Sequence, residues 1–147
     1  MRNIVIGIGN TLRADDGVGV HVVERLREER PEIEAVDLST ANVEILEYIR
    51  NRDRVVIVDA MRSGSDPGTV RKIRQEEIKE AGFRDSHGLD LSSLILLGRQ
   101  LYPDEMPDRI TIIGVEAEDI ESFTSEMTEY VEKAIPKVIE AIENELK

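Results

Sequence analysis

Apolar residues follow two patterns in this chain, and the two patterns alternate along most of its length. Short apolar runs predict buried strands at residues 3–8, 33–38, 54–58 and 109–115. Apolar positions spaced three or four residues apart predict helices at residues 18–29, 43–49, 91–101 and 124–146. Such an alternation is typical of a mostly parallel sheet with helices on both faces.

Proline and glycine positions refine this prediction. The turn residues at 66–68 predict that residues 69–73 form a short edge strand, antiparallel to its neighbour. Pro136 lies inside the last predicted helix and should kink it or split it in two. Residues 76–88 contain no predicted element, and connections of this length in compact domains are often functional.

Length and composition limit the fold and the partners. A chain of 147 residues suits one domain with its own core, so we expect a single α/β domain over residues 1–147. We expect a three-layer sandwich with a twisted sheet of about five strands. The absence of cysteine excludes thiolate ligands and suits the cytoplasm. A net charge of −12 disfavours nucleic-acid binding, and no apolar run suggests membrane insertion.

Two aspartates lie at the sheet edge where ligands bind in folds of this class. Asp16 lies in the loop after the first predicted strand, and Asp59 ends the third. Two carboxylates at adjacent strand ends must either share a proton or bind a cation. Asp15 has a different expected role, which is to cap the N–H groups at the start of the following helix.

The two histidines of the chain differ in their predicted surroundings. His87 lies in the long connection, outside any predicted helix or strand. With Asp16 and Asp59 it would form an oxygen and nitrogen set that suits Zn, Ni, Mn or Fe and leaves coordination positions open. His21 lies within the first predicted helix, where we expect it to pack or to be solvated. These residues leave open both a metal site and an aspartate pair that shares a proton.

A nucleotide site is a further alternative. Gly7 and Gly9 have the first two spacings of the dinucleotide motif G-x-G-x-x-G, and Asp37 could take the place of its ribose ligand. However, Leu12 occupies the third glycine position, and two carboxylates follow where a phosphate would bind. The zincin pattern H-E-x-x-H and a serine nucleophile elbow are both absent from the sequence.

The segment GIGNTLRADDGVG at 7–19 closely resembles the opening motif of the hydrogenase maturation proteases. The resemblance continues, in order, through DLSTANVEIL at 37–46, VVIVDA at 55–60, DPGTVR at 66–71, SHGLDL at 86–91 and IGVEAEDI at 113–120. It implies an endopeptidase that removes the C-terminal extension from the large-subunit precursor of a nickel–iron hydrogenase. It also implies that Asp16 and Asp59 are catalytic and that both, with His87, bind nickel brought by the precursor, for which zinc or another divalent ion could substitute.

The resemblance also assigns substrate recognition to the segment after the second strand. The family often has two glycines where this chain has Leu38 and Ser39, whereas Thr40 is kept and Asn42 follows. The corresponding segment of the family helps to select the precursor. The alternatives are a metal-independent acid peptidase that uses an aspartate pair, and a non-enzymatic nickel- or nucleotide-binding protein.

Overall fold

The computed structural model describes residues 2–80 and 91–147. Its described strands form one five-stranded sheet in the order β2-β1-β3-β5-β4. The strands are β1 (Asn3–Ile8), β2 (Ala35–Leu38), β3 (Arg54–Met61), β4 (Val70–Arg74) and β5 (Arg109–Glu116). All neighbours pair in parallel except β4, which is antiparallel to β5 at one edge. The predicted mostly parallel sheet with an antiparallel edge strand is therefore confirmed.

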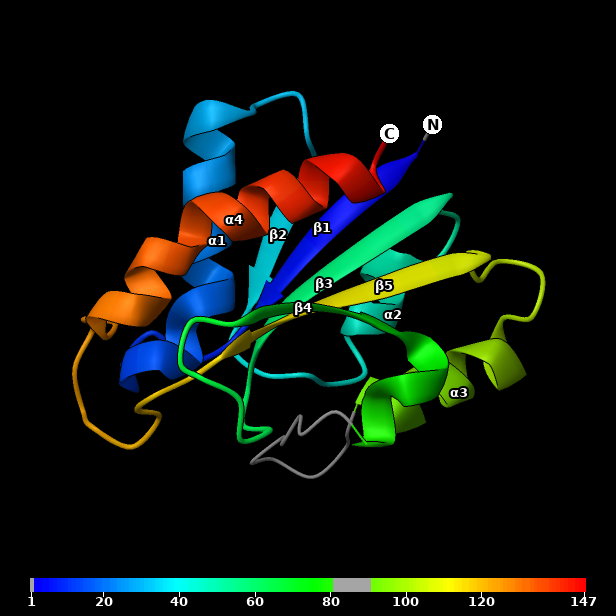
Figure 1. Ribbon diagram of the computed structural model, residues 1–147. Coiled ribbons are helices and arrows are strands. Elements are labelled where there is room, and N and C mark those ends of the chain that lie inside the picture. The colour runs from blue at the N-terminus through cyan, green and yellow to red at the C-terminus, as the bar shows by residue number, and fades with distance from the viewer. Residues whose placement is uncertain (1, 81–90) are drawn as a thin grey trace.

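Helices cover both faces of the sheet (Figure 1). One core lies between the sheet and α1 (Val18–Glu29) and α4 (Glu129–Glu145), and the other beneath α2 (Ile45–Ile49) and α3 (Leu91–Leu101). Successive strand residues contribute to opposite cores, because side chains alternate between the two faces of a strand. Val56 packs toward α1 and α4, whereas Ile57 packs toward α2 and α3. The predicted single-domain three-layer sandwich is confirmed.

The third strand is longer than its apolar run predicts. β3 continues to Met61, so the expectation that Asp59 ends this strand is wrong. The reason lies in its neighbour, because β5 also extends and pairs Asp59 with Gly114 and Met61 with Glu116. Asp59 therefore has a backbone position fixed by the sheet.

The last helix begins later than predicted, at Glu129, and runs without a break through Pro136. The expected split is therefore wrong. Pro136 lies on the exposed face of the helix. The carbonyl that loses its hydrogen-bond donor there can be solvated by water, which reduces the cost of the proline. Residues before Glu129 are held in other contacts, since Thr124 forms an isolated bridge with Arg13.

Smaller differences concern the loops. β2 starts at Ala35, two residues after the predicted start at 33, and α2 starts at Ile45 where residue 43 was predicted. Part of the predicted long connection forms a 3-10 helix, η2 (Gln75–Glu80). Within the described ranges, no helix combines the length and the apolar character needed to cross a membrane.

Candidate functional site

The parallel strands β1, β2, β3 and β5 end at one common edge of the sheet, and the predicted carboxylates lie there. Asp16 belongs to a short 3-10 helix, η1 (Ala14–Gly17), between β1 and α1. Asp59 lies near the end of β3 and follows Val58, which pairs with Gly7 of β1. Asp16 therefore lies in the connection after β1, and Asp59 lies near the carboxyl end of the neighbouring strand β3.

Glycines allow η1 and the start of α1 to lie directly on the strand ends. A Cβ atom at Gly9 would lie 1.9 Å from the carbonyl oxygen of Asp16. A Cβ atom at Gly19 would lie 2.4 Å from the carbonyl oxygen of Val58 and 2.6 Å from that of Ile8. Any larger residue would therefore push Asp16 away from the ends of β1 and β3.

The loop that carries Asp16 satisfies its own backbone donors. One carboxylate oxygen of Asp16 accepts the N–H of Asn10 at 3.0 Å, and the side chain of Asn10 accepts the N–H of Leu12 at 2.9 Å. The N–H of Arg13 bonds to the carbonyl of Asn10, and that of Asp16 to the carbonyl of Arg13. A phosphate would need these N–H groups, so their internal use argues against the nucleotide alternative.

Asp59 is half-buried and accepts the N–H of Ala60 at 2.9 Å. His87, the third predicted metal ligand, lies outside the described residues, as do the remaining predicted connection residues from 81 to 88. Within the described residues, no three acidic or histidine side chains form a group that could hold a metal ion. A three-ligand site of the predicted composition thus requires His87. His21 is half-buried on α1, with Nδ1 3.7 Å from Glu24 Oε2.

Asp15 is fully buried, and its role differs from the predicted one. Within the described residues, no side chain caps the start of α1, so the expected helix-capping role of Asp15 is wrong. Its carboxylate instead accepts the N–H groups of Glu118, Asp119 and Thr128 at 2.7–3.0 Å, and the hydroxyl of Thr128 at 2.8 Å. Asp15 and Asp16 are therefore used in different ways, with Asp15 committed to contacts inside the fold.

The predicted recognition segment contains both buried and accessible positions. Leu38 packs in the core, and its carbonyl accepts the N–H of Gly9 at 3.0 Å. Ser39 is exposed and Thr40 half-buried. Asn42 shapes the turn into α2, because its side chain donates to the carbonyl of Thr40 at 3.3 Å and accepts the N–H of Glu44 at 2.8 Å. Ser39 is the most accessible of the four predicted recognition residues.

Glu116 is a buried residue of this edge that the sequence analysis did not identify. It is the last residue of β5, and its carboxylate accepts the N–H of Ser63 at 3.0 Å and the hydroxyl of Ser63 at 2.5 Å. A hollow of about 560 Å³ adjoins it, lined among others by Arg62, Glu118 and Ile120. The sequence signal that could have identified Glu116 is its place as an acidic residue directly after the predicted apolar strand at 109–115.

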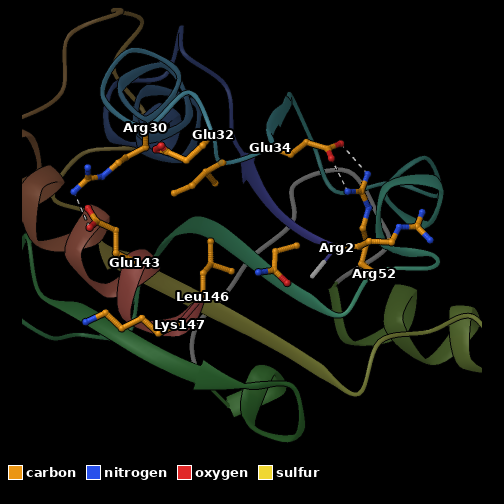
Figure 2. Close-up of a pocket in the computed structure, with 10 residues that line it drawn as sticks. Arg2, Arg30, Glu32, Glu34, Arg52, Glu143, Leu146 and Lys147 are labelled. Carbon is orange, nitrogen blue, oxygen red and sulfur yellow. Dashed lines mark hydrogen bonds and ion pairs between the residues drawn. The ribbon is translucent and has the colours of Figure 1, made fainter.

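A larger hollow, of about 800 Å³, lies at the opposite end of the strands (Figure 2). Charged side chains of its lining pair with one another. Arg30 contacts Glu143 at 3.0 Å, and Arg52 contacts Glu34 at 2.6 Å. The hydrogen bond that Arg52 donates lowers the pKa of Glu34, and the hydrogen bond that Arg30 donates to Glu143 raises the pKa of Arg30. None of the predicted site residues lines this hollow, so we assign the candidate site to the carboxyl edge.

Comparisons with known proteins agree with the resemblance. The sequence model of a family described as hydrogenase maturation protease matches residues 20–145. The hydrogenase 2 maturation protease of Escherichia coli K12 is 34% identical, over 97% of this chain and 91% of its own length. The hydrogenase expression/formation protein HupD of Rhizobium leguminosarum is 29% identical, over 95% of this chain and 71% of its own length.

Solved structures show the same fold. The hydrogenase maturating endopeptidase HybD from E. coli aligns with a TM-score of 0.82 at 33% identity, covering 97% of this chain and 90% of that chain. The [NiFe] hydrogenase maturation protease HybD from Thermococcus kodakarensis aligns with a TM-score of 0.81 at 27% identity, covering 98% of each chain. The similarity in both sequence and structure therefore extends over nearly the whole chain.

Proposed function

Because this chain belongs to the hydrogenase maturation protease family, we propose that it removes the C-terminal extension of a nickel-loaded large-subunit precursor. The observation that carries the proposal is that Asp16, in the connection after β1, and Asp59, near the end of β3, both lie toward the carboxyl edge of the sheet. Ligands of open α/β sheets bind at this edge. The proposed place of the reaction is the cytoplasm, where a cysteine-free chain needs no oxidising compartment.

The proposed basis of recognition is the nickel ion of the precursor. Asp16, Asp59 and His87 complete the coordination of a nickel that cysteine thiolates of the precursor already hold. The two carboxylates and the imidazole are hard or borderline ligands, and the precursor adds the soft thiolates that nickel also accepts. Coordination then places the scissile peptide bond beside the two aspartates, and this orientation lowers the barrier to reaction. A precursor without nickel lacks this contact and is not cut.

The chemical step adds water across one peptide bond. Either nickel polarises the carbonyl group, or one of the aspartates accepts a proton from the attacking water. In both routes the site must admit a polypeptide. Leu12 is half-exposed and Phe123 is 84% exposed, and the N–H of Thr124 bonds to the carbonyl of Leu12. These exposed apolar side chains, one in the loop of Asp16 and one in the segment after β5, support a polypeptide substrate.

The test is incubation of the purified chain with a hydrogenase large-subunit precursor, either nickel-loaded or nickel-free, with and without a chelator. We expect cleavage of the nickel-loaded precursor alone, observed as a mass loss equal to the C-terminal extension. Equal cleavage of both precursors would favour the metal-independent acid peptidase. Nickel binding with no cleavage of either precursor would favour a non-enzymatic carrier.

A further inference from the structure

Three acidic residues are almost completely buried in the described part of the chain: Asp15, Glu116 and Glu145, which are 0%, 3% and 6% exposed. A buried carboxylate is costly unless hydrogen bonds compensate the loss of water. All three are hydrogen-bonded, and two of them make their bonds at the carboxyl edge of the sheet. Their partners show what these two residues hold in place.

Asp15 connects η1 to the chain that follows β5. Its Oδ2 accepts the N–H of Glu118 at 2.9 Å and the N–H of Asp119 at 3.0 Å. The N–H of Asp15 in turn donates to the carbonyl of Asp119 at 2.9 Å. Since η1 contains only four residues, its attachment through Asp15 also fixes the backbone of the adjacent Asp16.

Glu116 connects the chain that follows the other aspartate, Asp59, to the same segment. Its carboxylate holds the N–H and the hydroxyl of Ser63, which lies in the loop directly after β3. The N–H of Ala117 donates to the carbonyl of Met61 at 2.9 Å. The chain immediately after Asp59 is thereby fixed to the end of β5.

We propose that residues 116–119, held by the buried carboxylates of Asp15 and Glu116, set the position of Asp16 relative to Asp59. Asp15 and Glu116 are thus positioning residues for the cleavage reaction. The inference rests on the proposed function, in which both aspartates contact the nickel and the reacting peptide bond. A displacement of about 1 Å at a reacting group can reduce a rate by about 10²-fold, so a small shift of either attachment is measurable.

The chain offers a matched control for this role. Glu145 is also a buried carboxylate, with bonds from the hydroxyl of Thr111 at 2.6 Å and the ammonium of Lys72 at 2.8 Å. Thr111 pairs with Val56, toward the amino ends of the strands, so Glu145 lies away from the aspartates. Loss of the Glu145 charge therefore measures how much the loss of any buried carboxylate lowers stability and activity, apart from a role at the site.

The experiment compares Asp15→Asn, Glu116→Gln and Glu145→Gln. We expect kcat for the nickel-loaded precursor to fall about 10-fold or more in the first two variants, with KM changed by less than about threefold. We expect all three variants to unfold at lower temperature, but Glu145→Gln to keep the wild-type kcat well below its melting temperature. An unchanged kcat in folded Asp15→Asn and Glu116→Gln would overturn the proposal, as would an equal loss in Glu145→Gln.

If Asp15→Asn and Glu116→Gln do not fold, milder variants test the same proposal. Thr128→Val and Ser63→Ala each remove one hydroxyl donor, whereas Thr128→Ser and Ser63→Thr keep it. We expect kcat to fall in the first pair and to return toward the wild-type value in the second. Equal kcat values in both pairs would contradict the proposal.

A second readout separates this proposal from the proposed function. Calorimetry with Ni²⁺ alone should show weaker binding to Asp15→Asn and Glu116→Gln, with Glu145→Gln binding like the wild type. That pattern, combined with a wild type that cuts no precursor, would reject the protease mechanism and support the positioning role. Cleavage by the wild type, together with unchanged kcat and unchanged Ni²⁺ binding in all variants, would support the protease mechanism and reject the positioning role.

Discussion

Adjacent acidic residues have different surroundings in this chain, and Asp15 and Asp16 show how the fold distinguishes them. Asp15 is fully buried and its carboxylate accepts four hydrogen bonds, whereas Asp16 is half-buried at the rim of the sheet and binds the N–H of Asn10. A carboxylate that reacts with a substrate must remain accessible. Accessibility therefore favours Asp16 for the proposed site function, whereas the hydrogen bonds of Asp15 give it a structural role.

The first prediction concerns Asp16 itself. Asp16→Asn keeps an acceptor oxygen for the N–H of Asn10, so we expect the fold and its melting temperature to be retained. It removes the charge and one ligand of the proposed nickel contact, and we expect cleavage of the precursor to fall by about 10²–10⁴-fold. Mass spectrometry of the precursor measures the rate. A wild-type rate would reject the assignment, and a larger loss in Asp15→Asn would mean that the two roles are exchanged.

At the scale of secondary-structure elements, the hydrophobic pattern predicted α1 and α3 with their observed bounds, because each helix buries one apolar face. It did not predict the last residues of β3, which are in the sheet because β5 pairs with them. It also placed the start of α4 too early, because residues before Glu129 are held by Arg13 and Asp15. Local hydrophobic patterns predict which helices and strands form, whereas contacts between residues distant in the sequence decide where they begin and end.

The same limit applies to the candidate site. The sequence predicted that Asp16 and Asp59 lie toward the carboxyl ends of neighbouring strands, because the apolar runs of β1 and β3 are visible in it, although β3 continues past Asp59. The separate role of Asp15 could not, since its partners Glu118, Asp119 and Thr128 lie more than 100 residues further along the chain. The role of Glu116 could not be predicted for a similar reason, because its partner Ser63 is 53 residues away in the sequence.

A second prediction concerns the close approach of η1 to the sheet. Gly9 has φ +150° and no space for a Cβ atom beside Asp16, whereas Gly64 has φ +91° and nothing within 4 Å. Gly64→Ala should therefore cost only backbone strain, about 1–2 kcal/mol. Gly9→Ala should cost about 1–3 kcal/mol more, because the carbonyl of Asp16 must move. Urea unfolding measures both values, and equal costs would contradict the close packing.

A third prediction concerns the segment between β2 and α2. Ser39 is exposed, so Ser39→Asp should change the relative cleavage rates of different precursors while the free energy of unfolding stays within about 0.5 kcal/mol. Leu38→Ala should instead destabilise the fold by about 2–5 kcal/mol, since Leu38 lies in the core. A panel of precursors, compared by initial rate, measures the first effect. A uniform loss across the panel in Ser39→Asp would indicate a structural role.

At the scale of the whole molecule, the two ends of the sheet carry different kinds of contacts. The carboxyl edge carries the accessible aspartates and the segments that hold them, whereas the described residues at the amino edge form ion pairs that link distant parts of the chain. Glu145 belongs to the second group, since it connects α4 to Lys72 of β4 and Thr111 of β5. We expect contacts of this kind to contribute to stability and not to the geometry of the proposed site.

The last prediction follows from the protonation of Glu145. Burial by itself would raise its pKa, but hydrogen bonds from Lys72 and Thr111, with the charges of Lys72 and Arg109, hold the pKa below the ordinary value of 4.5. The folded state therefore binds this proton less readily than the unfolded state does. The stabilising contribution is present above pH 4.5 and is lost as the pH falls through the lower pKa of the folded state. Glu145→Gln should be less stable than the wild type at pH 7, and the difference should shrink as the pH falls below 4.5. Urea unfolding of both proteins across this range measures the difference, and the exposed variant Glu140→Gln, which should show little change at any pH, is the control. A difference that stays constant or grows on acidification would mean that the ionised form of Glu145 is not the form that the fold stabilises.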